Sequence, residues 1–455
     1  MGLIRGFNYT IRYKAVDSAG NESIEDRTVI VQYKPFIIQI KTDNNGTSAS
    51  NAFEIPINTS YSNYDYSIDC DSDGIKEATH ISTTYTCTYA QPGTYQLSIQ
   101  GTFPAIKFYQ GSNQTDAKKL LKINQWGSII WQSMDSAFYK CNNLLITAAD
   151  APILYQVNSM RNMFAYASTL NANLNHWDVS TIKDMSFIFR DASSFNGDIS
   201  HWDTQNVTNM SYMFYRDFSF NQPLTNWDVS NVQYMNNMFN SAHLFNQPLA
   251  TWNTSNVLDM SGMFNGAYRF NQDISGWNIG HVTTTAYMLA NAQSFDQDIS
   301  GWNTQRVTSM RGMFQSTYLF NNDISGWNTS RVTDMAYMFY YAKSFDQDIS
   351  IWDTSRVTDM SYMFSNANSF DQDISNWNTS LVSNMKYMFY NAVSFDQNLA
   401  GWNTINVTNM DRMFYHANAF LEDLSGWNVA NVTTHFEFSK FSPLDSTPQY
   451  IPTFP

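Results

Sequence analysis

Carboxylates are the side chains best suited to chemistry in this sequence, and the densest group lies in the segment DCDSDGIKE, which begins at Asp69. Four of them fall at the first, third, fifth and ninth places of a calcium-binding loop: Asp69, Asp71, Asp73 and Glu77. Gly74 would supply the sharp turn of such a loop, but His80 stands where its bidentate glutamate belongs. The segment therefore predicts either a calcium site or a polar turn that holds no cation.

A second group of carboxylates recurs at intervals of 25 residues: Asp273, Asp298, Asp323, Asp348 and Asp373. On stacked turns of a repeat, such groups lie about 5 Å apart, and neighbours repel by about 1 kcal/mol in water. A cation, a neighbouring backbone N–H or the following Ser or Thr hydroxyl would offset this repulsion. The row therefore predicts a calcium row, an acidic binding face or a solvated, hydrogen-bonded turn ladder. Pro223, Pro248 and Asn398 interrupt the row, which weakens the case for cations. A parallel column of Asn and Asp from Asn196 to Asp396 is expected to bond the backbone of adjacent turns.

Catalysis finds no support in the sequence. It has no G-x-S-x-G, H-E-x-x-H or phosphate-loop motif, and no unique Ser, His and Asp that suggest a triad. The net charge of −14 argues against nucleic acid and anionic membrane surfaces as partners, because both attract basic patches. We therefore predict a protein that is not an enzyme and has no certain cofactor, calcium being the one candidate.

The cysteines and the N-terminus bear on the compartment. Cys70 and Cys87 lie in one strand-rich segment, where a disulfide is expected if the compartment is oxidising, and Cys141 is left over. No stretch is long enough to span a membrane, and the first residues lack the apolar core of a signal peptide. We predict an extracellular or cell-surface protein whose export signal is not present in this chain.

A 25-residue repeat dominates the chain. Eleven tryptophans, from Trp177 to Trp427, follow one another at this spacing without a slip, which indicates equivalent points on the turns of a solenoid. Each unit carries apolar residues at i, i+3, i+4 and i+7, such as Met360, Met363, Phe364 and Ala367. This pattern predicts a short helix with one buried face, capped by the hydroxyl at Thr358 and its equivalents, and then a short strand.

The repeat unit VTxMxxMFxxAxxFxQDIxxW resembles that of BspA-like leucine-rich-repeat bacterial surface proteins and the related lipoprotein repeat. The segment LLKINQWGSIIWQSMDSAFYKCNNLLITAADAPIL is similar to the entry cap of that family. The resemblance implies a leucine-rich-repeat solenoid on the cell surface with a role in adhesion or protein binding.

The front of the chain is expected to be all-β. The stretch CTYAQPGTYQLSIQG, with Tyr89, Gly93, Tyr95 and Gly101, resembles the last hairpin of a PKD-like, immunoglobulin-type sandwich. Residues 1–33 resemble the closing hairpin of a bacterial immunoglobulin-like repeat, so the chain is expected to begin inside a domain.

The predicted fold is an α/β repeat solenoid, leucine-rich-repeat-like, with one short strand and one short helix per turn, preceded by an all-β immunoglobulin-like sandwich. The predicted regions are an incomplete immunoglobulin-like hairpin at 1–34, a PKD-like sandwich at 35–104, an N-terminal solenoid cap at 105–156, the solenoid at 157–434 and a C-terminal cap and tail at 435–455.

Tyrosines recur on the predicted helices at positions expected to face solvent. Those of the C-terminal half form a candidate partner-binding face: Tyr337, Tyr340, Tyr362, Tyr387, Tyr390 and Tyr415. Exposed tyrosine brings a large contact area at low entropic cost. The sequence thus favours a non-catalytic surface binding or adhesion protein whose partner is a protein or glycan on another surface. The alternative is a surface-layer, stalk or fibre subunit that self-associates through its repeats.

Overall fold

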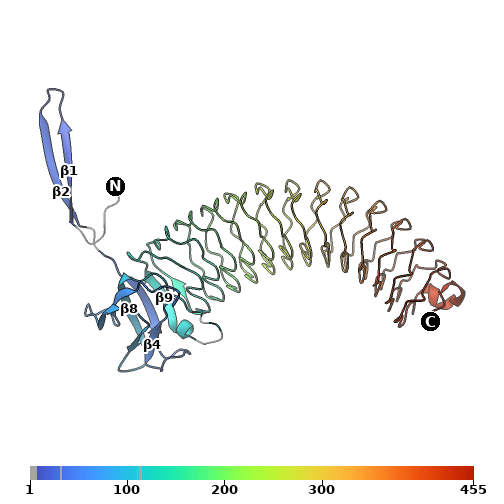
Figure 1. The fold of residues 1–455 in the computed structure, drawn as a ribbon, viewed down its shortest axis with the longest axis horizontal. Helices are drawn as coiled ribbons and strands as arrows, with labels where there is room; N and C mark the ends of the chain where they lie inside the picture. Colours follow the sequence, from blue (N-terminus) through green and yellow to red (C-terminus); the bar gives the residue numbers. More distant parts are fainter. Residues whose placement is uncertain (1–7, 31–32, 110, 112–114) are drawn as a thin grey trace.

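The structure is a computed structural model that describes residues 8–30, 33–109, 111 and 115–455. A hairpin and a compact β-domain are followed by an arched stack of turns, which occupies most of the chain (Figure 1). The strands and 3-10 helices, in chain order, are β1 (Asn8–Val16), β2 (Glu22–Ile30), β3 (Phe36–Lys41), β4 (Ala52–Ile55), β5 (Asp65–Asp69), β6 (Ala78–Ile81), β7 (Tyr85–Thr88), β8 (Thr94–Thr102), η1 (Asp116–Lys119), β9 (Leu120–Gln125), β10 (Leu145–Ile146), η2 (Pro443–Ser446) and η3 (Pro448–Tyr450).

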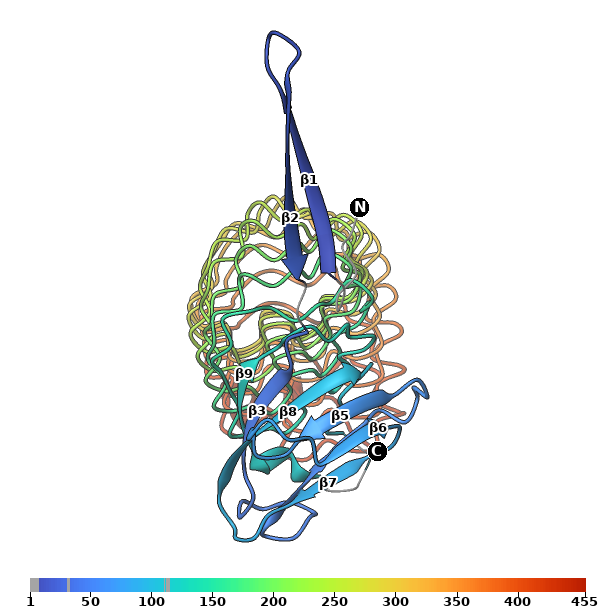
Figure 2. The same cartoon turned by 90° about the vertical axis from the view of Figure 1, so that its left-hand side faces the viewer.

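Strands β1 and β2 form an antiparallel hairpin that stands clear of the remaining chain in Figure 1 and extends beyond the solenoid in Figure 2. The side chains of residues 12–27 are all exposed, so this part of the hairpin buries nothing against the β-domain. Ion pairs join Arg12 to Asp26 and Lys14 to Glu22 across the strands, and exposed pairs of this kind contribute little. The hairpin is therefore an appendage and not part of the core.

The β-domain, residues 33–125, is built on a six-stranded sheet in the order β10-β9-β3-β8-β5-β6, faced by the two-stranded sheet β4-β7. Strand β3 alternates buried and partly exposed residues because successive side chains of a strand point to opposite faces. Phe36, Ile38 and Ile40 are the buried set and are fully covered. A disulfide between Cys70 and Cys87 links the end of β5 to β7 in the smaller sheet.

The β-domain and the solenoid share one sheet and one core. Strand β9 pairs antiparallel with β3 on one side and parallel with β10, from the first turn of the solenoid, on the other. Trp126 and Trp131 pack on Phe36, with ring centroids 5.7 and 5.3 Å apart. The open end of the first turn is thus covered by aromatic side chains of the β-domain, as a solenoid requires at its ends.

The solenoid contains no α-helix among the described residues, so the prediction of an α/β solenoid with one helix per turn is wrong. An α-helix needs N–H groups that bond carbonyls four residues back. In the turn from Met335 to Ala342, alternate N–H groups bond carbonyls three residues back, as from Met338 to Met335. The N–H groups between them bond carbonyls of the next turn, as from Tyr337 to Ser361. Each unit is a run of β-turns joined to its neighbours by single parallel bridges such as Asp334↔Asp359.

The run of turns explains why the apolar spacing resembled that of a helix. Two residues of each turn, four positions apart, have a left-handed backbone, for example Tyr337 at φ 61° and Tyr341 at φ 57°, which no right-handed helix accommodates. Successive turns still direct residues i, i+3, i+4 and i+7 inward, and Met360, Met363, Phe364 and Ala367 are all fully buried. The hydroxyl of Thr358 does not cap a helix but donates to the carbonyl of Thr333 in the preceding turn at 3.1 Å.

Columns of identical side chains fill the interior. Phe339 and Phe364 stack with centroids 5.6 Å apart, and Trp327 and Trp352 lie 6.5 Å apart with nearly parallel rings. Each indole N–H from Trp202 to Trp427 donates to a carbonyl 28 residues earlier, as Trp352 does to Ile324 at 3.2 Å. The large aromatic residues therefore both bury apolar area and bond adjacent turns.

The last turn is covered by the C-terminal segment, which contains η2 and η3. Leu444 is fully buried, and the Phe454 ring lies 5.1 Å from that of Phe438. The N–H of Leu424 donates to the carbonyl of Tyr450 at 2.9 Å, whereas the equivalent N–H of Leu174 donates to Asp198 of the following turn at 3.0 Å. Both ends of the stack are thus covered by segments that lack the repeat, the β-domain at one end and the C-terminal segment at the other.

Candidate functional site

The six tyrosines predicted as a partner-binding face lie together on the solenoid, and we call them the tyrosine face: Tyr337, Tyr340, Tyr362, Tyr387, Tyr390 and Tyr415. Three of them form a column across consecutive turns, with ring centroids 4.5 Å apart between Tyr337 and Tyr362 and 4.7 Å between Tyr362 and Tyr387. The others contact this column or each other: Tyr340 packs on Tyr337, Tyr390 on Tyr387, and Tyr415 stacks on Tyr390. All six are partly buried and not fully exposed as the helical pattern had implied.

Two arginines close the tyrosine column at its ends, and the sequence analysis did not single them out. The Arg311 guanidinium lies 5.1 Å from the Tyr337 ring centroid, and its Nε donates to the Tyr287 hydroxyl at 2.9 Å. Arg412 lies 5.7 Å from the Tyr387 ring centroid and donates to that tyrosine's hydroxyl at 2.8 Å. Each arginine contacts tyrosines about one repeat away in the sequence, so the 25-residue period was the signal that could have predicted these pairs. The cations stabilise the stack electrostatically through the ring faces.

The residues of the column share one left-handed position in the turn. Tyr337, Tyr362 and Tyr387 have φ of 61°, 60° and 57°, a left-handed conformation that is unfavourable for bulky residues. Equivalent positions in other turns carry Asn162, Asn237, Gly262 and Gly312, residue types that adopt this conformation readily, but also the aromatic residues Phe187, Tyr212 and Tyr287. Gly312 also leaves room for a neighbour, since a Cβ there would lie 2.4 Å from the Tyr287 ring.

The acidic loop, residues 69–77, connects β5 to β6 at the edge of the larger sheet. It brings together the four carboxylates that the sequence singled out, with one oxygen from each of Asp69, Asp71, Asp73 and Glu77 within 4.8 Å of the others. Asp69 accepts the N–H of Gly74 at 3.0 Å, and Glu77 accepts that of Cys70 at 2.6 Å. The loop therefore folds back on itself with its carboxylates converging.

The repeated aspartates form local hydrogen bonds within their own turns; they lie at positions 273, 298, 323, 348 and 373. All five are exposed, and each accepts the N–H of the serine two residues later, as Asp348 does from Ser350 at 2.9 Å. The Ser350 hydroxyl and N–H lower the pKa of Asp348. Within the described residues they do not join any group of three or more metal-ligating side chains. Their geometry is that of a hydrogen-bonded turn ladder.

The Asn and Asp column that follows the repeat phenylalanine bonds the backbone of adjacent turns. Its side-chain oxygens accept the N–H of the equivalent residue one turn later, as Asn246 does from Asn271 at 3.0 Å. Glutamine side chains such as Gln272 donate to the same oxygen at 2.9 Å. This column is part of the framework that holds the tyrosine face in register.

Comparison with known proteins assigns the repeats. The family described as "Mycoplasma protein of unknown function, DUF285" matches residues 132–249, 218–316, 277–363 and 346–448, which together cover more than half of the chain. The chain belongs to this family. No curated protein and no solved structure matched the sequence.

The DUF285 match covers the solenoid, with the whole tyrosine face, and leaves out the acidic loop. It establishes a repeat protein and does not extend to the BspA-like and PKD-like resemblances. Among the described helices of this DUF285 protein, none combines the length and the apolar character needed to cross a membrane.

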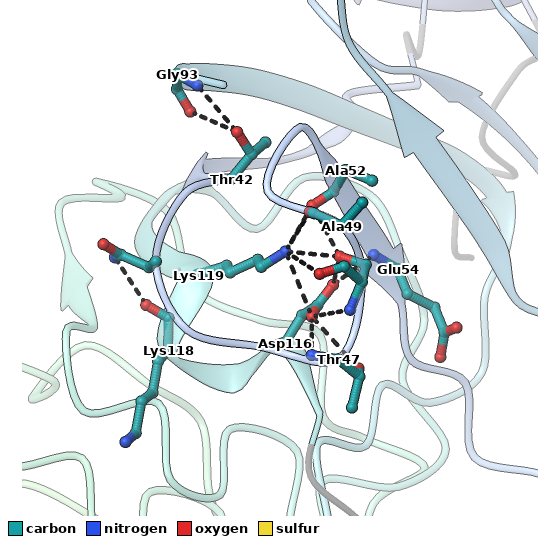
Figure 3. A network of polar contacts seen from close by, with 11 residues as sticks. Thr42, Thr47, Ala49, Ala52, Glu54, Gly93, Asp116, Lys118 and Lys119 are labelled. Atoms are coloured by element: carbon teal, nitrogen blue, oxygen red, sulfur yellow. Dashed lines mark hydrogen bonds and ion pairs between the residues drawn. The ribbon is translucent and has the colours of Figure 1, made fainter. Parts of the chain in front are cut away.

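A buried ion pair joins the β-domain to η1 of the DUF285 protein, and sequence reasoning missed it (Figure 3). Asp116 accepts backbone N–H groups of the loop before β4, from Thr47 at 2.8 Å and Ser48 at 3.0 Å, and of Glu54 within β4 at 2.8 Å. The Lys119 ammonium, 3.7 Å from Asp116, donates to the carbonyls of Ser48 and Ala49 in the same loop and of Ala52 at the start of β4. Burial lowers the Lys119 pKa, against the influence of Asp116. Because both side chains bond the backbone of residues 47–54, the role of the pair is to hold this segment against η1.

Proposed function

We propose that this protein is a non-catalytic, extracellular binding protein whose tyrosine face contacts a protein on another surface. The observation that carries the proposal is the column of Tyr337, Tyr362 and Tyr387, stacked in three consecutive turns on left-handed backbone. A left-handed conformation costs about 1 kcal/mol or more for each such residue relative to glycine. Asparagine or glycine would fold as well at these places, so folding alone does not account for the aromatic residues.

The stacking geometry favours a protein partner over a glycan. Ring planes in the column are inclined by only 8° and 12°, and arginines lie over the rings at its two ends. The ring faces, on which sugars would stack, are therefore occupied. The ring edges and hydroxyl groups remain, and with nearby Arg and Lys they suit the mixed polar and aromatic contacts of protein interfaces.

Two further features support the extracellular setting. The disulfide between Cys70 and Cys87 is of a kind that persists in oxidising compartments. The resemblance of the repeat to BspA-like surface proteins points in the same direction. Self-association through the repeat ends receives less support, since the β-domain covers one end and the segment with Leu444 covers the other.

The test replaces the three tyrosines of the column by asparagine, which adopts the left-handed conformation at these positions more readily. The triple variant Tyr337→Asn, Tyr362→Asn, Tyr387→Asn is expected to keep the melting temperature within a few degrees and to lose most binding of labelled protein to cultured cells. A matched control is Phe187→Asn with Tyr212→Asn, a stacked pair in the same column of earlier turns, which is expected to bind as wild type.

Pretreatment of the cells separates the candidate partners. Protease treatment is expected to abolish binding, while glycosidase treatment leaves it. Binding that survives in the triple variant would refute the role of the tyrosine face, and loss by glycosidase alone would assign a glycan. Sedimentation velocity of the unmixed protein tests the structural-subunit alternative, which requires concentration-dependent assembly.

A further inference from the structure

We propose that the acidic loop is a calcium site that stabilises the β-domain. This inference concerns a part of the chain outside the family match and does not depend on the proposed function. Its basis is the convergence of Asp69, Asp71, Asp73 and Glu77, whose ligand oxygens lie within 4.8 Å of one another.

The second observation is a buried oxygen without a partner. Asp69 is only 8% exposed, yet its Oδ1 is covered and accepts no hydrogen bond, while its Oδ2 accepts the N–H of Gly74. Buried carboxylate oxygens are ordinarily hydrogen-bonded or bound to a metal, because burial of an unpaired charge is unfavourable. Asp69 is therefore the residue of the loop with an unmet need for a positively charged ligand.

No cationic side chain of the described residues meets that need. Among the described residues, no lysine, arginine or histidine forms an ion pair with any of the four carboxylates; His80 instead contacts Asp65, at 3.0 Å. Four negative charges so close together repel one another, and a divalent cation would remove the repulsion and satisfy Asp69 at once.

The donor atoms select the cation. All are hard carboxylate oxygens, and the cluster contains no histidine or cysteine ligand of the kind that zinc and other transition metals favour. The backbone carbonyl of Ile75 stands at the seventh place of the loop, which in calcium loops supplies a further oxygen. Magnesium prefers fewer carboxylates, a smaller cage and retained waters. The set fits calcium, with affinity in the range of extracellular modules because the bidentate glutamate is lacking.

The surroundings show what the ion would stabilise. Cys70, between two of the ligands, is bonded to Cys87 in the smaller sheet, and its carbonyl accepts the hydroxyl of buried Tyr89 at 2.6 Å. Burial raises the pKa of Tyr89, and the negative charges of Asp71, Glu77 and Asp69 raise it further. A calcium ion would hold the β5–β6 connection at the point where the disulfide ties the two sheets together.

Isothermal titration of the full chain, freed of metal with a chelator, tests the site. One ion per chain is expected, with a dissociation constant of about 0.1–1 mM for Ca²⁺ and weaker binding of Mg²⁺. Calcium is also expected to raise the melting temperature at fixed ionic strength. The variant Asp71→Asn with Asp73→Asn keeps the side-chain oxygens that accept the loop N–H groups, at 3.2 and 2.7 Å, so it is expected to fold.

That double variant is expected to weaken Ca²⁺ binding more than about tenfold and to abolish the thermal shift. The control Asp348→Asn, with Asp373→Asn, removes the same charge from the exposed turn ladder and is expected to change neither. Absence of saturable Ca²⁺ binding in the wild type, or equal binding by the Asp71 and Asp73 variant, would overturn the proposal. Loss of binding in the ladder control alone would move the site to the solenoid and likewise refute it.

Discussion

Asp217 is a carboxylic acid in the middle of an apolar column. The equivalent places in the flanking turns are Ala192 and Ala242, and Asp217 is as fully buried as they are. Only the backbone N–H groups of Ser219 and Phe220 lie near its side-chain oxygens, without well-formed hydrogen bonds, and burial raises its pKa well above the ordinary value. The folded protein therefore holds this group neutral, and ionisation opposes folding.

Replacement of Asp217 by alanine is expected to stabilise the protein by about 2 kcal/mol at neutral pH, because an unsatisfied polar group leaves the core. The pH dependence follows from the raised pKa. Below about pH 4 the acid is protonated in both states, and above it only the folded state keeps the proton, so wild-type stability falls as pH rises. Melting temperatures of both proteins between pH 4 and 8 should diverge with rising pH. Curves that run parallel, or a less stable variant, would contradict the assignment.

The repeating turn is the element that carries this fold, and Trp302 shows how it is held. The side chain is 3% exposed, its indole N–H donates to Ile274 at 3.1 Å, and its ring stacks on Trp327 at 6.2 Å. Trp302→Ala removes the packing and the inter-turn bond together, and should reduce the free energy of unfolding by about 3–5 kcal/mol in urea denaturation. Ile405→Ala, at a 43% exposed position, serves as the control and should change it by less than about 0.5 kcal/mol. Equal effects would mean that the tryptophan column does not hold the turns together.

Sequence reasoning at this scale identified which residues repeat and point inward but not the backbone that carries them. A 25-residue period in Trp and Phe requires equivalent turns, whatever their conformation. The spacing of Met360, Met363 and Phe364 is shared by a helix and by a chain of β-turns, so burial alone does not separate them. The separating signal was glycine and asparagine at the left-handed positions, as in Gly262 and Asn366, where a helix would disfavour both.

The candidate sites were predictable to the degree that their residues are close in the sequence or in register. The acidic loop is nine residues long, and its carboxylates converge as the spacing implied. The tyrosine column follows from the period. Asp116 and Lys119, in contrast, bond a loop nearly 70 positions earlier, and no local pattern or repeat connects the two segments.

The molecule as a whole is one continuous apolar core, from Phe36 in the β-domain to Leu444 in the C-terminal segment. Because each turn contacts only its neighbours, the stability of the stack depends on the closure of its two ends. The β-domain closes the first end through a shared sheet and through Phe36, which packs on Trp126 and Trp131 of the first turn. The hairpin β1–β2 contributes nothing comparable, since its described side chains are exposed.

Removal of residues 443–455 should therefore turn a closed solenoid into an associating one. The deletion uncovers the Phe438 side of the last turn and removes the carbonyl of Tyr450 that accepts the Leu424 N–H. Exposed apolar surface and unpaired backbone groups at such an end favour pairing with another chain. Sedimentation velocity should show wild type as a monomer and the truncated protein as dimers or larger species, with a lower melting temperature. Deletion of residues 1–30, which removes an exposed hairpin and no end closure, should leave both properties unchanged. A truncated protein that stays monomeric and equally stable would show that the last turn closes itself.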